Sequence, residues 1–142
     1  MYARGAMVGL TRGTKPEHII RAAQESIAYQ SYDLVDAMKK DAGVTLSQLR
    51  VDGGASRDGF LMQFQADMLA KPVRRPVIRE TTALGACYLA GLATGVWSSR
   101  DELKELWRCD TLYAPSMEDE KRSRLLNGWD KAVGRSLDWA EH

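Results

Sequence analysis

Two adjacent glycines in the middle of the chain, Gly53 and Gly54, are the residues best suited to hold a ligand. They follow residues 49–52, which are typical of a short strand, and a helix is expected to begin near Asp58. Glycine lacks a Cβ, so it permits a positive φ and lets a ligand approach the backbone. Free N–H groups at the helix start would face that ligand. The pattern predicts a binding site for an anion or a nucleotide. A tight turn that binds no ligand is an equally open alternative.

A basic cluster and a small-residue helix are two further candidates. Arg74, Arg75 and Arg79 could meet a phosphate or could form a solvated edge of the sheet. Gly85 and Gly91 lie in a predicted helix, where each glycine costs about 1 kcal/mol relative to alanine. That cost predicts a second backbone packed close to the helix.

The cysteines and histidines form no catalytic or zinc-binding pattern. Cys87 and Cys109 have no CxxC partner, and the only histidines are His18 and His142. A disulfide and a pair of free thiols both remain open, with Cys87 expected to be buried among small residues. We therefore expect no catalytic residue and no metal ligand in this chain.

Composition indicates one globular domain or part of one. The chain has 142 residues, is 44% hydrophobic and 27% charged, and carries a net charge of +1. Such a balance predicts neither nucleic acid nor an anionic membrane as a partner. Its start lacks the apolar segment of a signal peptide, and its apolar stretches are too short to span a bilayer. A cytoplasmic location is expected.

The alternation of strand-like and helical patterns predicts an α/β fold, with short parallel strands packed by helices. The expected elements are a strand at 6–10, a helix at 15–41, a strand at 49–52, a helix at 58–70, an extended segment at 72–77, helices at 83–95 and 100–107, a loop at 111–117 and a helix at 118–141.

Three of these elements carry expectations about packing. Helix 15–41 should bury the face that includes Ile20, Ile27 and Leu34, because these residues recur at helical spacing. Helix 83–95 is apolar or small nearly all round and should be enclosed on all sides. Prolines should confine segment 72–77 to a strand start or a sheet edge.

Several sequence blocks resemble the FGGY carbohydrate kinases, and glycerol kinases in particular. They occur in the family's order and spacing along essentially the whole chain. The matching blocks are YARGA at 2–6, GLTRG at 9–13, HIIRA at 18–22, ESIAYQ at 25–30, LRVDGGA at 49–55, FLMQFQAD at 60–67, TALGA at 82–86, YLAGLA at 88–93 and WDKAV at 129–133.

This resemblance implies a fold and a site. Residues 1–142 would be the C-terminal part of the family's C-terminal ATPase domain, a partial RNase H-like (actin-like ATPase) domain. The N-terminal domain and the first strands of this domain would be absent. Gly53 and Gly54 would approach the phosphates and ribose of ATP. Asp58 would lie near adenine, where the family usually has asparagine, and an ionised aspartate can only accept hydrogen bonds.

The resemblance also implies an activity. The full-length protein would transfer the γ-phosphoryl group of ATP to glycerol, forming glycerol 3-phosphate, with Mg²⁺ as counter-ion. Its partners would be ATP or ADP and glycerol, which the absent N-terminal part would bind. We expect the isolated chain to be inactive and to self-associate, either through the open edge of strand 49–52 or by exchange of helices. Two alternatives are the same segment of another FGGY polyol or sugar kinase, and a non-catalytic interaction module.

Overall fold

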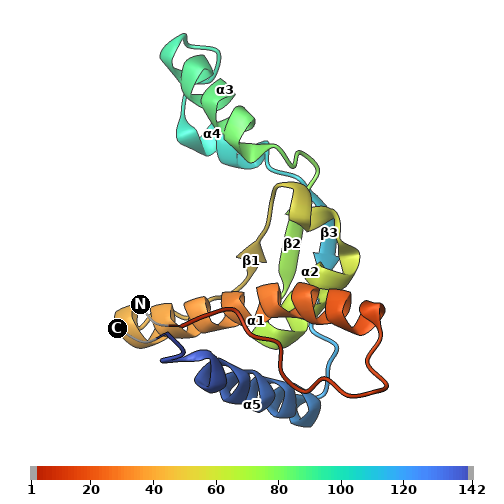
Figure 1. The fold of residues 1–142 in the computed structure, drawn as a ribbon. Coiled ribbons are helices and arrows are strands. Elements are labelled where there is room, and N and C mark those ends of the chain that lie inside the picture. The colour runs from red at the N-terminus through yellow and green to blue at the C-terminus, as the bar shows by residue number, and fades with distance from the viewer. Residues whose placement is uncertain (1–2, 141–142) are drawn as a thin grey trace.

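The computed structural model describes residues 3–140 as a small sheet packed against crossing helices (Figure 1). The elements are α1 (Pro16–Ala42), β1 (Leu49–Arg50), the 3₁₀ turn η1 (Gly54–Arg57), α2 (Gly59–Leu69), β2 (Val73–Pro76), α3 (Thr81–Ala93), α4 (Arg100–Glu105), β3 (Cys109–Tyr113) and α5 (Asp119–Ser136). The predicted α/β class is confirmed.

The sheet has the order β1-β2-β3, with β1 parallel and β3 antiparallel to β2. Of the two positions predicted for segment 72–77, a strand start or a sheet edge, the sheet edge is wrong, because β2 is the central strand. Its prolines are tolerated since Pro72 precedes the strand and Pro76 ends it at a register shift opposite Cys109. The loop predicted at 111–117 is also wrong in its first half, which pairs with β2 as part of β3.

Local signals define the two helices nearest the sheet. α1 ends before Gly43, which adopts a left-handed φ of 64°. Asp58 caps α2 by accepting a hydrogen bond from the Leu61 amide at 3.1 Å. Both helices lie close to their predicted positions because caps and periodicity depend only on neighbouring residues.

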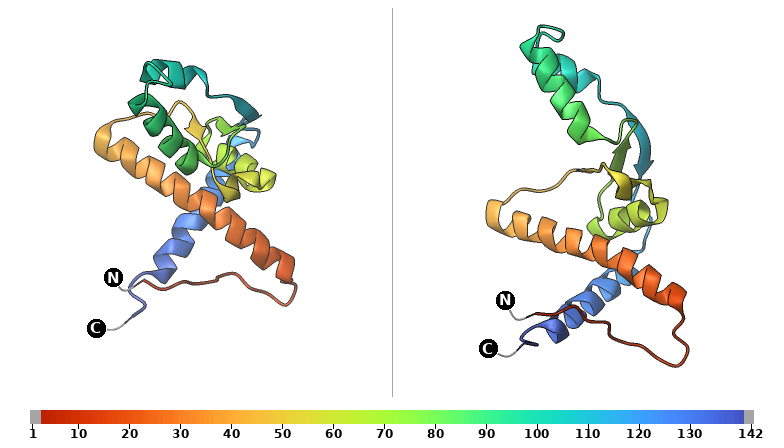
Figure 2. Two further views of the ribbon diagram at one scale, coloured as in Figure 1. Left: turned by 90° about the horizontal axis from the view of Figure 1, so that it is seen from above. Right: turned by 45° about the horizontal axis from the view of Figure 1, so that its top comes forward.

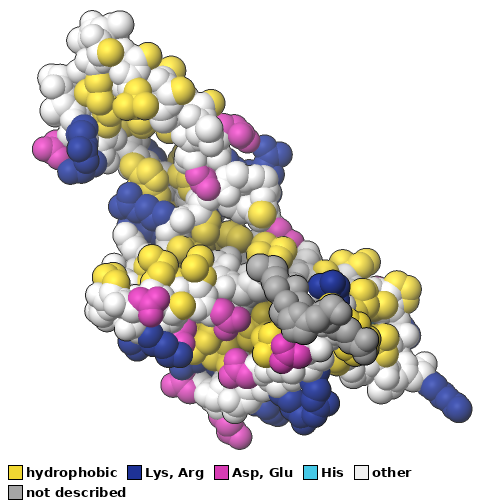
Figure 3. Space-filling model, turned by 60° about the vertical axis from the view of Figure 1, so that its left-hand side comes forward, with side chains coloured by type: hydrophobic (Ala, Val, Ile, Leu, Met, Phe, Trp, Pro, Cys, Tyr) yellow, Lys and Arg dark blue, Asp and Glu magenta, His cyan; other side chains and the backbone are white. Residues whose placement is uncertain are grey.

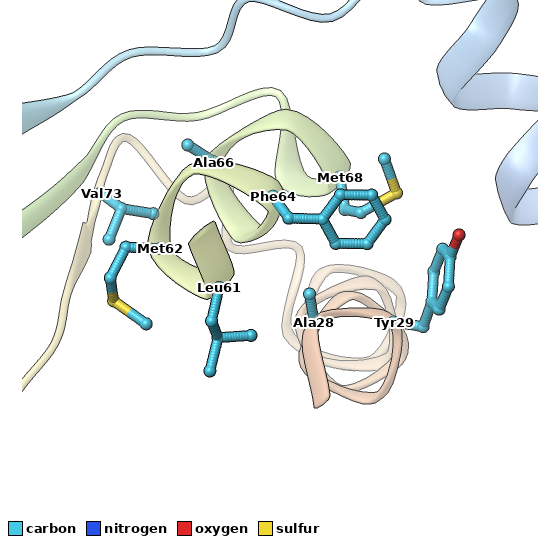
Figure 4. Packing of buried hydrophobic residues seen from close by; sticks show 8 residues of the cluster. All are labelled: Ala28, Tyr29, Leu61, Met62, Phe64, Ala66, Met68 and Val73. Carbon is cyan, nitrogen blue, oxygen red and sulfur yellow. The ribbon is translucent and has the colours of Figure 1, made fainter. Parts of the chain in front are cut away.

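The core lies where α1 crosses α2 (Figure 4). Ala28 is fully buried, and its small side chain lets the two helices approach closely. Tyr29 meets Phe64 edge-on, with ring centroids 5.4 Å apart, and stacks on Trp129 of α5 at 5.2 Å. Burial raises the pKa of Tyr29 to about 12, and the nearby Glu25 carboxylate acts in the same direction.

The predicted inward face of α1 is wrong. Ile20, Ile27 and Leu34 are exposed, because α2 packs on the adjacent stripe of α1 that contains Ala28 and Tyr29. Residues 6–10, predicted as a strand, are exposed and are not assigned to the sheet. The last helix ends at Ser136, whereas its predicted end at 141 lies outside the described residues.

α3 and α4 extend away from the core as a separate pair (Figures 1 and 2). The predicted enclosure of α3 is wrong, because Gly91 is its only buried residue and Leu89 is 71% exposed. Cys87, predicted to be buried, is also exposed. A Cβ on Gly91 would collide with the Trp97 ring, so a side chain rather than a backbone packs there. Hydrophobic atoms therefore gather on the surface of this pair (Figure 3).

Substitution of Phe64 tests the core. Phe64→Ala should lower the free energy of unfolding by about 3 to 5 kcal/mol, because it leaves a cavity between α1 and α2. Leu89→Ala, at an exposed position, is the control and should change it by less than about 0.5 kcal/mol. Urea unfolding followed by tryptophan fluorescence measures both variants. Equal losses for the two variants would contradict this description of the core.

Candidate functional site

The glycine turn joins the end of β1 to the start of α2. Gly53 combines a φ of 72° with a ψ of −174°, a positive-φ conformation that residues with a Cβ adopt rarely. Its N–H donates to the carbonyl oxygen of Arg79 at 2.9 Å. Its own carbonyl oxygen accepts from the Ser56 hydroxyl at 2.7 Å and from the Ser56 amide at 3.3 Å. The turn is therefore fixed on both sides of Gly53.

The space beside both glycines is open. No heavy atom outside the neighbouring residues lies within 4 Å of the position where a Cβ would stand on Gly53 or Gly54. Gly54 is exposed, and Gly53 is half-buried. The sequence predicted a backbone that a ligand could approach, and the geometry of the turn is compatible with one.

Asp58, the third predicted ATP-binding residue, lies at the base of the same turn. One carboxylate oxygen caps α2 at Leu61, and the other accepts from the side-chain amide of Gln24 in α1. The carboxylate thus links α1 to α2 at the end of the turn. Its predicted position near adenine stays a prediction.

Two members of the basic cluster, Arg75 and Arg79, form ion pairs within the protein. Asp110 of β3 lies 2.8 Å from Arg75 and 3.6 Å from Arg79, measured between side-chain N and O atoms. The Arg75 and Thr111 hydrogen bonds hold the pKa of Asp110 below its usual value. Neither a solvated edge nor a phosphate site describes Arg75, because its side chain is only 14% exposed and is already paired.

Sequence reasoning missed two residues of this site. Ser56 is 1% exposed and bonds the Gly53 carbonyl, and a serine that soon follows a glycine pair is a signal that could have identified it. Asp110 carried no local signal, because its role depends on pairing of β3 with β2.

Two cavities lie away from the turn. One of about 440 Å³ lies between α3, α4 and the end of β2, and includes Tyr88 and Trp107 in its lining. Another of about 770 Å³ lies between the N-terminal segment, α1 and α5, and includes Tyr29 and Trp129. Neither is lined by the glycine turn.

A cluster of metal ligands, a disulfide and a membrane-spanning helix are all absent from the described residues. Within 3–140, no three histidine, cysteine, aspartate or glutamate side chains gather to hold a metal ion. Cys87 and Cys109 are free thiols, which decides between the two alternatives left open by the sequence. In the same part of the chain, none of the helices has the length and apolar character needed to cross a bilayer.

Comparison with known proteins decides the family. A model described as the FGGY family of carbohydrate kinases, C-terminal domain, matches residues 2–94. The chain belongs to the FGGY family. The glycerol kinase of Caldanaerobacter subterraneus subsp. tengcongensis is 61% identical over 141 residues, and that of Clostridium beijerinckii is 60% identical over 141. Each match covers 99% of this chain and 28% of the relative. This FGGY chain thus spans little more than a quarter of the curated relatives it matches.

Solved structures confirm the fold. Plasmodium falciparum glycerol kinase with ADP superimposes with a TM-score of 0.84 and 39% identity, over 95% of this chain and 27% of that one. The xylulose kinase of Rhodospirillum rubrum gives a TM-score of 0.77 at 24% identity, over 95% of this chain and 28% of that one, and shows the fold alone. The resemblance to the C-terminal portion of glycerol kinases, with their actin-like ATPase fold, is confirmed.

Alanine at each glycine distinguishes their backbone roles. Gly53→Ala should lower the free energy of unfolding by about 1 to 3 kcal/mol, because its positive φ with an extended ψ is unfavourable for alanine. Gly54→Ala is the matched control, since Gly54 has no positive φ and open space beside it. It should change the free energy by less than about 0.5 kcal/mol. Thermal unfolding followed by circular dichroism measures both, and a larger loss at Gly54 would contradict this geometry.

Proposed function

We propose that this chain supplies part of the ATP site of a glycerol kinase. The observation that carries the proposal is the identity of about 60% with glycerol kinases along 99% of the chain. Xylulose and gluconate kinases with the same fold share only 24% identity with it. Glycerol is therefore favoured as the acceptor over another polyol or sugar, and a non-catalytic module is not favoured.

The glycine turn is the part of this chain that would meet the nucleotide. The Gly54 backbone would approach the phosphates and ribose of ATP, because open space lies beside it. The ADP named with the Plasmodium relative supports a nucleotide ligand. Gly53 would set the direction of the turn, since its amide and carbonyl are both bonded within the protein.

Asp58 would lie at the adenine end of the nucleotide. A carboxylate there could accept a hydrogen bond from the adenine amino group. Its oxygens already accept from Leu61 and Gln24, so adenine would share these acceptors. The negative charge of Asp58 would also repel the phosphates of ATP. Asp58→Asn should therefore raise the affinity of the site for ATP.

The reaction would be an in-line phosphoryl transfer. A glycerol oxygen forms a bond to the γ-phosphorus, the bond from phosphorus to the β–γ bridging oxygen breaks, and the hydroxyl proton passes to a base. The acceptor pocket and the base would lie in other parts of the protein. Mg²⁺ would enter with ATP as its counter-ion, where it would offset the charge of the phosphates. A cytoplasmic location, where ATP is available, would suit this reaction.

A chimeric enzyme tests this function. In it, the chain replaces the matching C-terminal segment of the Caldanaerobacter subterraneus glycerol kinase, which is 61% identical. The chimera should phosphorylate glycerol in a coupled assay with ATP and Mg²⁺, because the segment would restore the nucleotide site. The isolated chain should show no turnover above a protein-free blank, since it would lack the acceptor pocket.

A glycine variant in the turn and a matched control in α5 test the role of Gly54 in the same assay. Gly54→Val in the chimera should raise the KM for ATP and leave the KM for glycerol unchanged, because the added side chain would occupy the open space. Gly128→Val, in α5 and away from the turn, should leave both constants near those of the unmodified chimera. A folded chimera without activity, or an active isolated chain, would contradict the proposed function.

Self-association through β1 is a separate prediction. The Leu49 amide donates to the carbonyl of Pro72, just before β2, and the Val51 amide donates to that of Arg74 in β2. Arg50 therefore directs its backbone groups to the other edge of β1, where no strand pairs in the described part of the chain. Such an edge can pair with another chain. Sedimentation of the isolated chain should show a dimer or larger species at tens of micromolar, and Arg50→Pro should reduce it because proline donates no hydrogen bond. A monomer across this range would contradict it.

A further inference from the structure

We propose that Arg75, held by Asp110, is a positioning residue for the nucleotide. It touches no nucleotide itself, and acts by fixing the glycine turn through Ser56. This inference rests on the proposed nucleotide role of the turn. It states that the ion pair between Arg75 of β2 and Asp110 of β3 determines the conformation of that turn.

The Arg75 guanidinium points its donors in two directions. Its Nε and Nη2 atoms donate to the same Asp110 oxygen at 3.0 and 2.8 Å, and Nη2 also donates to the Thr111 hydroxyl at 2.7 Å. On the other side, Nη1 donates to the Ser56 carbonyl at 3.2 Å. Arginine is required for this because its planar group carries five donors in a fixed fork, whereas lysine has a single ammonium.

Ser56 transmits this constraint to the glycine turn. It is 1% exposed, and its hydroxyl and amide both bond the Gly53 carbonyl. The Gly53 amide bonds the carbonyl of Arg79, whose guanidinium also lies 3.6 Å from Asp110. Each side of Gly53 is therefore connected to one carboxylate, through Arg75 on one side and through Arg79 on the other.

The bond from Arg75 to Ser56 is not needed to hold the sheet together. β2 and β3 pair through their backbones over four register positions. Ser56 lies outside the sheet, in η1, which follows Gly53 directly. Loss of the guanidinium should therefore shift the turn while the sheet remains paired. Displacements of about 1 Å near a reacting group can change rates by about a hundredfold.

The first experiment measures the turn in the chain itself. Arg75→Gln should shift the ¹⁵N–¹H signals of residues 53–56, and Arg75→Lys and Asp110→Asn should shift them less. Arg122→Gln, which breaks a 3.0 Å ion pair with Asp119 in α5, is the matched control and should leave these signals in place. Near-UV circular dichroism confirms that each variant is folded. Folded Arg75 and Asp110 variants with unshifted turn signals would overturn the proposal.

The second experiment measures the nucleotide in the chimeric enzyme described above. Arg75→Gln should raise the KM for ATP by about tenfold, because the turn loses a hydrogen bond from a charged group. The KM for glycerol should stay unchanged, and Arg75→Lys should lie in between. Equal changes in the KM for ATP and the KM for glycerol, or an unchanged KM for ATP, would overturn the positioning role of Arg75. Either result would leave the proposed function standing. If Arg75→Gln does not fold, Arg75→Lys and Asp110→Asn decide by the same comparison. An unmodified chimera that is folded but inactive would instead overturn the proposed function, and this inference with it.

Discussion

The positive φ at Gly53 is the constraint on which this structure depends. It lets the chain leave β1, turn, and enter α2 with Asp58 in place as the helix cap. α2 then packs its buried side chains against α1 and the sheet. A residue with a Cβ would be strained at this φ. The conformation of Gly53 therefore determines both how α2 enters the core and how the backbone of the candidate site is exposed.

The described chain divides into a packed part and an exposed part. Around α1, α2 and the sheet, the core is filled by alanine, leucine, methionine, valine and aromatic side chains. The Trp129 indole N–H of α5 donates to the Asp33 carboxylate of α1 at 2.7 Å and links these two helices. α3 and α4 project from this core and present apolar side chains at the surface (Figure 3). The glycine turn lies where the two parts meet, since Thr81 at the start of α3 bonds Asp52 just before the glycines.

Local features of the sequence were sufficient for α1, α2 and the glycine turn. Gly43 stops one helix, Asp58 starts the next, and Gly53 lies between strand and helix, so each depends only on residues nearby. The family could also be predicted, because its sequence blocks occur in the family's order along the chain.

Features that depend on distant partners could not be predicted. β3 forms because β2 lies beside it, and Asp110 matters because Arg75, on another strand, reaches it. The buried face of α1 is set by the helix that packs on it, so periodicity alone selected the wrong stripe. An apolar pattern such as that of α3 shows that a surface is suited to contact, without showing which element provides that contact.

A crystal structure of the chimeric enzyme with ADP tests the central claim most directly. The account predicts that the ADP phosphates or ribose lie within van der Waals distance of the Gly54 backbone, about 4 Å, with Gly53 still at a positive φ. ADP bound elsewhere, with side chains packed over both glycines, would contradict it.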